Sequence, residues 1–388
     1  MPSSSIHSPI KKNLKKEWLF ASVFAIFFAG LIYLLLNYFW EADYALRWLG
    51  LASAFSMWQL LILWRSLPSN HREGEDELLS TLGWGNAVSF ARGIFIAGLL
   101  GFLFSPWPKG WLGWLPFTFY LLAAFSDLLD GYLARINNHV TKLGAALDMN
   151  NDSWGVLIVT GLVFWYGQVP IWYLPVGLAR YIFIAGLWLR EKQGKENLEM
   201  PPSFRRRIFA GIQMGFIVSM LAPPFSPPAT TLAASLFMLP FLVGFLYDWF
   251  LITGKIDPEK GVKLFDDFLI SAPMRWIPFI IRLITAATLI LLTIEMWQSI
   301  FVQLPVFLAL LWIIFSLSAI VMLLLGVLGR LGAIFALIVA GLIFSSQANH
   351  IFLLFAGTAL LFTGTGVFSL WSPEEWLIYN RAGEQADA

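Results

Sequence analysis

The sequence contains no cysteine and few charged residues. Of its 388 residues only 13% are Asp, Glu, Lys or Arg, compared with about 25% in soluble domains. Without cysteine the chain has no disulfides, thiolate metal sites or cysteine nucleophile. The net charge of +1 provides no general attraction to polyanions, so nucleic acid is not expected as a partner.

Apolar and aromatic residues dominate the chain instead. Hydrophobic residues make up 58% of it, with 35 Phe and 19 Trp, and the mean hydropathy is +0.72. Aromatic side chains in such numbers are typical of lipid-facing surfaces and interfacial belts. The composition therefore predicts a multi-pass, all-α integral membrane protein in contact with the lipid bilayer.

Apolar runs of about 20 residues, the length that crosses a bilayer, predict about twelve transmembrane helices. The expected spans are 18–40, 44–64, 86–106, 112–133, 145–166, 170–189, 207–222, 230–253, 276–297, 302–325, 331–346 and 350–371.

The distribution of Lys and Arg predicts the orientation of these spans. With the N-terminus inside and the sides alternating, Lys109 is the one Lys or Arg that falls in an outside segment. Because Lys and Arg favour the cytoplasmic side, we expect both termini to be cytoplasmic. Arg282 falls one to two turns inside its span, and we expect it to snorkel to the inner interface.

An acidic motif stands out in this apolar chain. It reads D-x-x-D-G-x-x-A-R, then eight residues, then G-x-x-x-D-x-x-x-D. Two carboxylates end the span 112–133 and two begin the span 145–166, and both ends are expected to face the cytoplasm. Each pair shares one helix face, and the short connection 136–143 holds the two ends together. The converging carboxylates are Asp127, Asp130, Asp148 and Asp152.

Four carboxylates beside a membrane are costly without compensating charge. Hard divalent cations prefer carboxylate oxygen, so two Mg²⁺ or Mn²⁺ ions are expected here, with open positions for phosphate oxygens. Gly131, Ala134 and Gly144 remove side-chain bulk, which lets a flat base or a pyrophosphate approach the backbone. Arg135 can bind phosphate oxygens with its planar fork.

This spacing resembles the signature of the CDP-alcohol phosphatidyltransferase family, with every fixed position present. A second pattern agrees with it, since Asn86, Ser89 and Arg92 are similar to the N-x-x-T-x-x-R that begins the family's first core helix, with Ser in place of Thr. The resemblance covers about residues 78–254. For Asn86 and Ser89 the alternative is capping of that helix.

The resemblance implies a six-helix membrane core, often a homodimer, whose active site opens to the cytoplasm. Such proteins transfer a phosphatidyl-type group from a CDP-linked donor, here expected to be CDP-diacylglycerol, to a small alcohol acceptor and release CMP. By position, Asp127, Asp130 and Asp148 would bind metal. Asp152 would be the general base and would also touch a metal. Nucleotide-binding roles would fall on Asn86, Ser89, Arg92, Gly131, Ala134, Arg135 and Gly144.

Arginines near the predicted core suggest the acceptor. Arg180 lies inside the span 170–189, where an unpaired cation is expensive. Arg205, Arg206 and Arg207 begin the next span. If both sets line one cavity, the acceptor carries phosphate, such as glycerol-3-phosphate or inositol phosphate. The alternative for the triplet is a topology anchor or a lipid-headgroup contact.

The expected organisation has three parts. An extension with two transmembrane helices covers 1–77, the CDP-alcohol phosphatidyltransferase-like core covers 78–254, and a membrane domain of about four helices and unassigned function covers 255–388. Two other functions stay open, namely a transporter or ion-binding protein that uses the aspartates and an inactive scaffold of the same fold.

Overall fold

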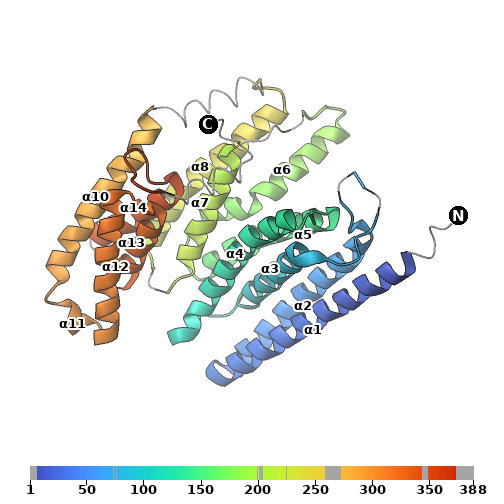
Figure 1. The fold of residues 1–388 in the computed structure, drawn as a ribbon, viewed down its shortest axis with the longest axis horizontal. Coiled ribbons are helices and arrows are strands. Elements are labelled where there is room, and N and C mark those ends of the chain that lie inside the picture. Colours follow the sequence, from blue (N-terminus) through green and yellow to red (C-terminus); the bar gives the residue numbers. More distant parts are fainter. Residues whose placement is uncertain are drawn as a thin grey trace. The chain divides into compact units, whose positions relative to one another are not determined.

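The computed structural model describes residues 7–72, 74, 75, 77–198, 200, 204–223, 225–257, 272–342 and 348–372, and the regular structure of this part of the chain is helical (Figure 1). A helix lies at each of the twelve expected spans. These helices are α1 (His7–Phe39), α2 (Ala42–Ser66), α3 (Gly83–Gly101), α4 (Leu115–Ile136), α5 (Lys142–Trp165), α6 (Leu174–Lys192), α7 (Phe204–Met220), α8 (Ala229–Ile252), α10 (Ala272–Met296), α12 (Val306–Leu325), α13 (Gly329–Leu342) and α14 (Ala348–Thr363).

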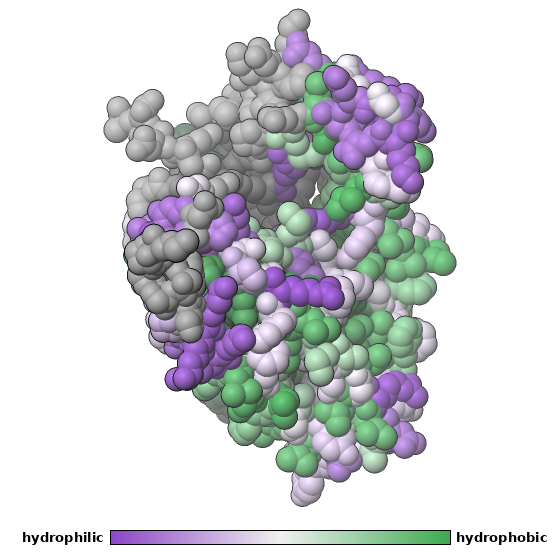
Figure 2. All heavy atoms as spheres, turned by 90° about the vertical axis from the view of Figure 1, so that its right-hand side faces the viewer, coloured by the Kyte–Doolittle hydropathy of each residue, from purple (hydrophilic) through white to green (hydrophobic). Residues whose placement is uncertain are grey.

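Seven helices in the described residues are long and apolar enough to cross a membrane. The other helices are shorter or more polar, and among them α3 carries Arg92 and α5 carries Asp148 and Asp152. Figure 2 shows hydrophobic side chains at the surface, mixed with hydrophilic ones on the face in view. Exposed side chains such as Phe20, Ile26 and Phe27 on α1 are well suited to lipid. The prediction of an all-α, multi-pass integral membrane protein is confirmed.

The chain forms two compact units, which are described separately. The first comprises Met1–Arg180 with Ile217–Pro223, and the second comprises Tyr181–Phe216 with Pro224–Ala388. In the first unit α2 packs against α1 and α3, and α3 packs against α4 and α5. The indole of Trp48 donates to the carbonyl of Gly98 at 2.9 Å, which ties α2 to α3. Helix α3 is thus the central element of this unit.

The connection between α4 and α5 is short, and local hydrogen bonds fix its backbone conformation. Asn138 has a φ of +49°, a left-handed conformation that Asn tolerates and that ends a helix. The next amide, from His139, bonds back to the carbonyl of Ala134 at 2.8 Å. Thr141 then caps α5 by accepting from the amide of Gly144 at 3.1 Å. These turns bring the end of α4 close to the start of α5.

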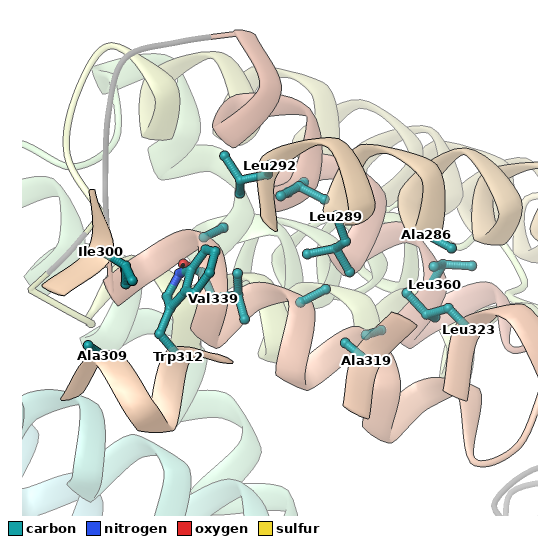
Figure 3. Close-up of a cluster of buried hydrophobic side chains, with 14 residues drawn as sticks. Ala286, Leu289, Leu292, Ile300, Ala309, Trp312, Ala319, Leu323, Val339 and Leu360 are labelled. Atoms are coloured by element: carbon teal, nitrogen blue, oxygen red, sulfur yellow. Dashed lines mark hydrogen bonds between the residues drawn. The ribbon is translucent and has the colours of Figure 1, made fainter. Parts of the chain in front are cut away.

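In the second unit α10, α12, α13 and α14 form a bundle around an apolar core (Figure 3). The indole of Trp312 lies in this core and donates to the carbonyl of Val339 at 3.1 Å. Small residues such as Ala286 and Ala319 line the remaining contacts, and small side chains let membrane helices approach closely.

The expectation that Arg282 snorkels to the interface is wrong. Its side chain is 1% exposed and donates to the carbonyls of Thr365 at 3.0 Å and Phe368 at 3.1 Å. Carbonyls that follow the end of α14 have no helical partners of their own, and a guanidinium with five donors satisfies several at once. Arg282 therefore ties α10 to the segment after α14.

Candidate active site

Helices α3, α4 and α5 place the motif residues together in the first unit. The carboxylates of α4 lie in its last three turns, and those of α5 lie in its first three turns. Arg92 lies near the middle of α3 and is 2% exposed. A buried guanidinium requires acceptors, and the carboxylates of the two neighbouring helices provide them.

Arg92 contacts three of the four aspartates. Its Nη1 lies 2.6 Å from Oδ1 of Asp127 and 2.8 Å from Oδ1 of Asp148, and its Nη2 donates to Oδ1 of Asp152. The three carboxylate side chains remain 31%, 51% and 41% exposed, respectively. Arg92 thus binds the group from its buried side while solvent reaches the other side.

This three-aspartate group (Asp127, Asp148 and Asp152) has the composition of a divalent-cation site. One oxygen from each residue lies within 4.8 Å of the others, and carboxylate oxygen is the donor that Mg²⁺ and Mn²⁺ prefer. With all three ionised, the group and the Arg92 guanidinium carry a net charge of −2. That charge and the open side suit one divalent ion.

The fourth aspartate has different partners. Asp130 is 7% exposed, and its Oδ2 accepts from the hydroxyl of Ser89 at 2.7 Å. Its Oδ1 accepts from the amide of Gly131 at 2.6 Å. Sequence spacing placed all four carboxylates in one volume. The structure brings three of them together and holds the fourth against Ser89.

Asn86 and Gly144 meet where α3 crosses the start of α5. The amide of Asn86 donates to the Thr141 hydroxyl at 3.0 Å and to the Leu82 carbonyl at 2.7 Å. A Cβ on Gly144 would lie 2.5 Å from Oδ1 of Asn86, so this position has no room for a side chain. Asn86 lies inside α3 and does not cap it.

Ala134 lies at the close crossing of α3 and α4. A Cβ on Gly85 would lie 2.9 Å from Cβ of Ala134 and 3.0 Å from the carbonyl oxygen of Asp130. Gly85 and Ala134 therefore allow the two helices to approach beside the carboxylates. Gly131 lies one turn earlier on α4, and the exposed Arg135 extends past it, with Nη1 3.2 Å from where a Cβ would be.

The predicted acceptor residues fall in both units. In the first unit, Arg180 is close enough to Asp148 for their charges to interact. In the second unit, Nη1 of Arg206 lies 3.4 Å from Oδ1 of Asp248, a buried carboxylate. The side chains of Arg205 and Arg207 lie outside the described residues.

Tyr120 was not recognised from the sequence. It is buried on α4, two turns before Asp127, and its electrostatic neighbours are Arg92, Asp127 and Asp152. Its hydroxyl has no hydrogen-bond partner within the described part of the chain. The spacing of seven residues from Asp127 puts both on one helix face, which is the signal that could have found it.

Comparison with known families agrees with this geometry. Residues 84–249 match the family described as CDP-alcohol phosphatidyltransferase. Residues 84–249 form a CDP-alcohol phosphatidyltransferase domain. This transferase domain contains Arg92, Asp130 and the three-aspartate group, and it lies inside the predicted core 78–254. The predicted family is confirmed for residues 84–249, whereas the boundaries of the three expected parts stay a prediction.

Two curated relatives have the same name, CDP-diacylglycerol–glycerol-3-phosphate 3-phosphatidyltransferase. The protein of Cereibacter sphaeroides is 36% identical over 88 residues, which are 22% of this chain and 40% of that protein. The protein of Blochmanniella floridana is 29% identical over 121 residues, which are 30% of this chain and 62% of that protein. The chain thus spans about two fifths to three fifths of these relatives. No solved structure matches the chain.

Proposed function

We propose that the protein transfers the phosphatidyl group of CDP-diacylglycerol to glycerol-3-phosphate and releases CMP. The observation that carries the proposal is the three-aspartate group around Arg92, which lies within the transferase domain. The names of the two relatives support this donor and acceptor. Inositol phosphate is the other acceptor that fits a site with an additional arginine.

Asp127, Asp148 and Asp152 would hold Mg²⁺ or Mn²⁺, with Asp130 as a fourth ligand. A bound divalent ion would neutralise pyrophosphate oxygens and improve CMP as a leaving group. The net charge of −2 on the group and Arg92 is balanced by one such ion. We infer that a second ion binds together with the donor, because the pyrophosphate brings the additional negative charge.

Asp152 is the proposed general base. It is 41% exposed and contacts Arg92 through one oxygen, which leaves its other oxygen open to an acceptor hydroxyl. In this reaction the hydroxyl oxygen attacks the phosphorus that carries the diacylglycerol. The bond from that phosphorus to the CMP oxygen breaks, and Asp152 takes the hydroxyl proton and passes it to solvent. A base at hydrogen-bond distance is sufficient for this step.

Arg92 has a positioning role in this proposal. Its two terminal nitrogens contact carboxylates from both α4 and α5, so it holds the two helices in one arrangement before substrate arrives. Preorganised charge of this kind accounts for much of the catalysis in phosphoryl transfer. Ser89 fixes Asp130 in the same way.

The nucleotide would lie over the small residues of the motif. Gly131 keeps side-chain bulk away from this face, and the exposed Arg135 can reach phosphate oxygens. Ala134 and Gly144 would shape the pocket from its packed side, by letting α3 approach α4 and α5. Asn86 would contribute mainly by holding α5 through Thr141. We further propose that this face is cytoplasmic, that both termini lie on the same side, and that the protein is a homodimer.

We propose that Arg180 binds the acceptor's phosphate, since its charge acts on Asp148. Arg205, Arg206 and Arg207 are the further acceptor candidates, although Arg206 already pairs with Asp248. Arg180→Ala should raise the KM for glycerol-3-phosphate about tenfold or more, because a hydrogen bond to a charged group contributes ~1.5–3 kcal/mol. Arg190→Ala on the same helix is the control. An unchanged KM in Arg180→Ala would remove Arg180 from the acceptor site.

The proposed function is tested directly with purified protein, CDP-diacylglycerol and Mg²⁺ or Mn²⁺. Glycerol-3-phosphate, inositol phosphate, glycerol and serine are supplied separately, and CMP and the lipid product are measured by mass spectrometry. We expect CMP release only with glycerol-3-phosphate, with an equal amount of phosphatidylglycerol phosphate. CMP release that depends on another acceptor would show that the proposed acceptor is wrong. No CMP release with any acceptor would refute the transferase reaction.

A further inference from the structure

A buried amide network links α2, which precedes the transferase domain, to the acidic turns of α5. Gln59 on α2 is fully buried. Its Nε2 donates to Oδ1 of Asn151 at 3.1 Å, and its Oε1 accepts from Nδ2 of Asn150 at 3.1 Å. Both partners lie between Asp148 and Asp152 in the sequence. One side chain from outside the transferase domain therefore binds the segment that joins two of the aspartates.

The network continues from α5 to α3. Asn151 is also fully buried, and its Nδ2 donates to the backbone carbonyl of Ser89 at 2.7 Å. The hydroxyl of Ser89 in turn binds Asp130. Buried polar contacts thus join α2, α5 and α3. They lead to Asp130 through Ser89, and to Asp148 and Asp152 through the segment of α5 between them.

Gly93 makes this meeting of side chains feasible. A Cβ at this position would lie 2.8 Å from Cδ of Gln59, 3.0 Å from its Oε1 and 3.1 Å from Oδ1 of Asn151. Gly93 follows Arg92 directly on α3. The space that the two amides occupy therefore exists only because this residue has no side chain.

The contacts fix the rotation of α5 about its axis. Successive residues of a helix are about 100° apart, so holding Asn151 also sets the directions of Asp148 and Asp152. Leucine or methionine at position 59 would fill similar space without specifying that direction. Amides buried between membrane helices have few alternative partners, so their hydrogen bonds to one another favour this one arrangement.

We propose that Gln59 is a positioning residue for the three-aspartate group, and that α2 thereby serves the site from outside the transferase domain. Gln59 touches no substrate. It acts through Asn150 and Asn151 on the aspartates beside them. The expected change in kcat rests on the proposed function. The expected change in Mn²⁺ affinity rests on the carboxylate geometry alone.

The test compares Gln59→Met, which keeps the volume and removes the amide, with Ser56→Ala. Ser56 is buried on the same helix, and its hydroxyl donates to the carbonyl of Ala52 at 2.8 Å, within that helix. The affinity for Mn²⁺ is measured by electron paramagnetic resonance on folded, monodisperse protein, and kcat and KM are measured in the CMP-release assay. Mn²⁺ binding requires no turnover.

We expect Gln59→Met to weaken Mn²⁺ binding about tenfold, the lower end of the effect of removing groups that orient metal ligands, because Gln59 acts on the aspartates through Asn150 and Asn151. The kcat should fall about tenfold as well, because small displacements of reacting groups are costly, while the KM for CDP-diacylglycerol changes less. Ser56→Ala should match the wild type. A folded Gln59→Met protein with wild-type Mn²⁺ affinity and kcat would overturn the inference.

A second variant covers the case in which Gln59→Met does not fold. Gly93→Ala places a methyl group against the Gln59 amide and should also weaken Mn²⁺ binding. Gly50→Ala, on α2 with open space around it, is its control, and equal affinities in these two variants would refute the inference. If the wild type binds Mn²⁺ without releasing CMP, the proposed function fails and the affinities still decide the role of Gln59. A wild type that binds no Mn²⁺ would overturn both.

Discussion

Replacing Arg92 with Met should have opposite effects on metal binding and on catalysis. The substitution keeps an apolar stem of similar length and removes the guanidinium from Asp127, Asp148 and Asp152. In metal-free protein the three carboxylates then repel each other without a nearby cation. A divalent ion would replace the missing positive charge, so the variant should depend on metal for stability more than the wild type does.

The magnitude follows from the exposure of the carboxylates, which is 31–51%. Removing one partner of a fully buried pair costs ~3–5 kcal/mol, and solvent reduces this to about 1–3 kcal/mol for metal-free Arg92→Met. A divalent ion about 4 Å from a guanidinium is repelled by ~2 kcal/mol even in bulk water. Relieving that repulsion should tighten Mg²⁺ binding at least about tenfold.

The assay is thermal unfolding of detergent-purified protein across a Mg²⁺ titration that begins in chelator. Arg92→Met should unfold at a lower temperature than the wild type without metal and should recover at lower Mg²⁺ concentrations. Its transferase activity should be lost. Arg47→Met is the control, because Arg47 is exposed and donates to the carbonyl of Phe104. If the unfolding temperature of Arg92→Met depends on Mg²⁺ concentration in the same way as those of the control and the wild type, Arg92 and the metal do not bind the same carboxylates.

Three further predictions concern single positions. Asp152→Asn should abolish CMP release while CDP-diacylglycerol still binds, as measured by protection from thermal unfolding; normal turnover would remove Asp152 as the base. Gly85→Ala should destabilise the protein by about 1–3 kcal/mol through overpacking against Ala134, whereas Gly30→Ala, which meets no neighbour, should not; equal melting temperatures would show that α3 and α4 can separate freely. Arg282→Met removes the donor to the buried carbonyl of Thr365 at a cost of ~1–3 kcal/mol, so limited proteolysis should cut the second unit faster, and an unchanged digestion pattern would contradict its structural role.

The positions of the helices could be predicted, since a helix of the described residues lies at each of the twelve expected spans. Seven of these helices are long and apolar enough to cross a membrane, the length of an apolar run being the signal for a span. Helix ends could not be predicted. Helix α1 begins at His7, well before the expected start at 18, because the lysine-rich segment continues the helix beyond the apolar run. The span 302–325 begins at Val306 instead, after the short α11 (Ile300–Gln303) and Pro305.

The sequence predicted which residues form the candidate site better than it predicted which of their side chains contact one another. Spacing within α4 and α5 placed the aspartates on shared faces, since helical periodicity is local. The position of Arg92 among them depends on how α3 packs, and Gln59 lies far from the motif in sequence. Tyr120 is different, because it lies seven residues before Asp127 on the same helix. For Arg282 the distance from the helix end indicated snorkelling, but its acceptors follow 83 and 86 residues later. Contacts between distant segments have no local signal in a single sequence.

The central claim is that aspartates of α4 and α5 bind the divalent cation on which the transfer depends. Crystals grown with Mn²⁺ and a non-hydrolysable CDP-diacylglycerol analogue, measured at the manganese absorption edge, test it most directly. We predict an anomalous peak between the carboxylates of Asp127, Asp148 and Asp152, with the analogue's pyrophosphate beside it. A peak at another place, or an empty aspartate group with the analogue bound elsewhere, would contradict the account.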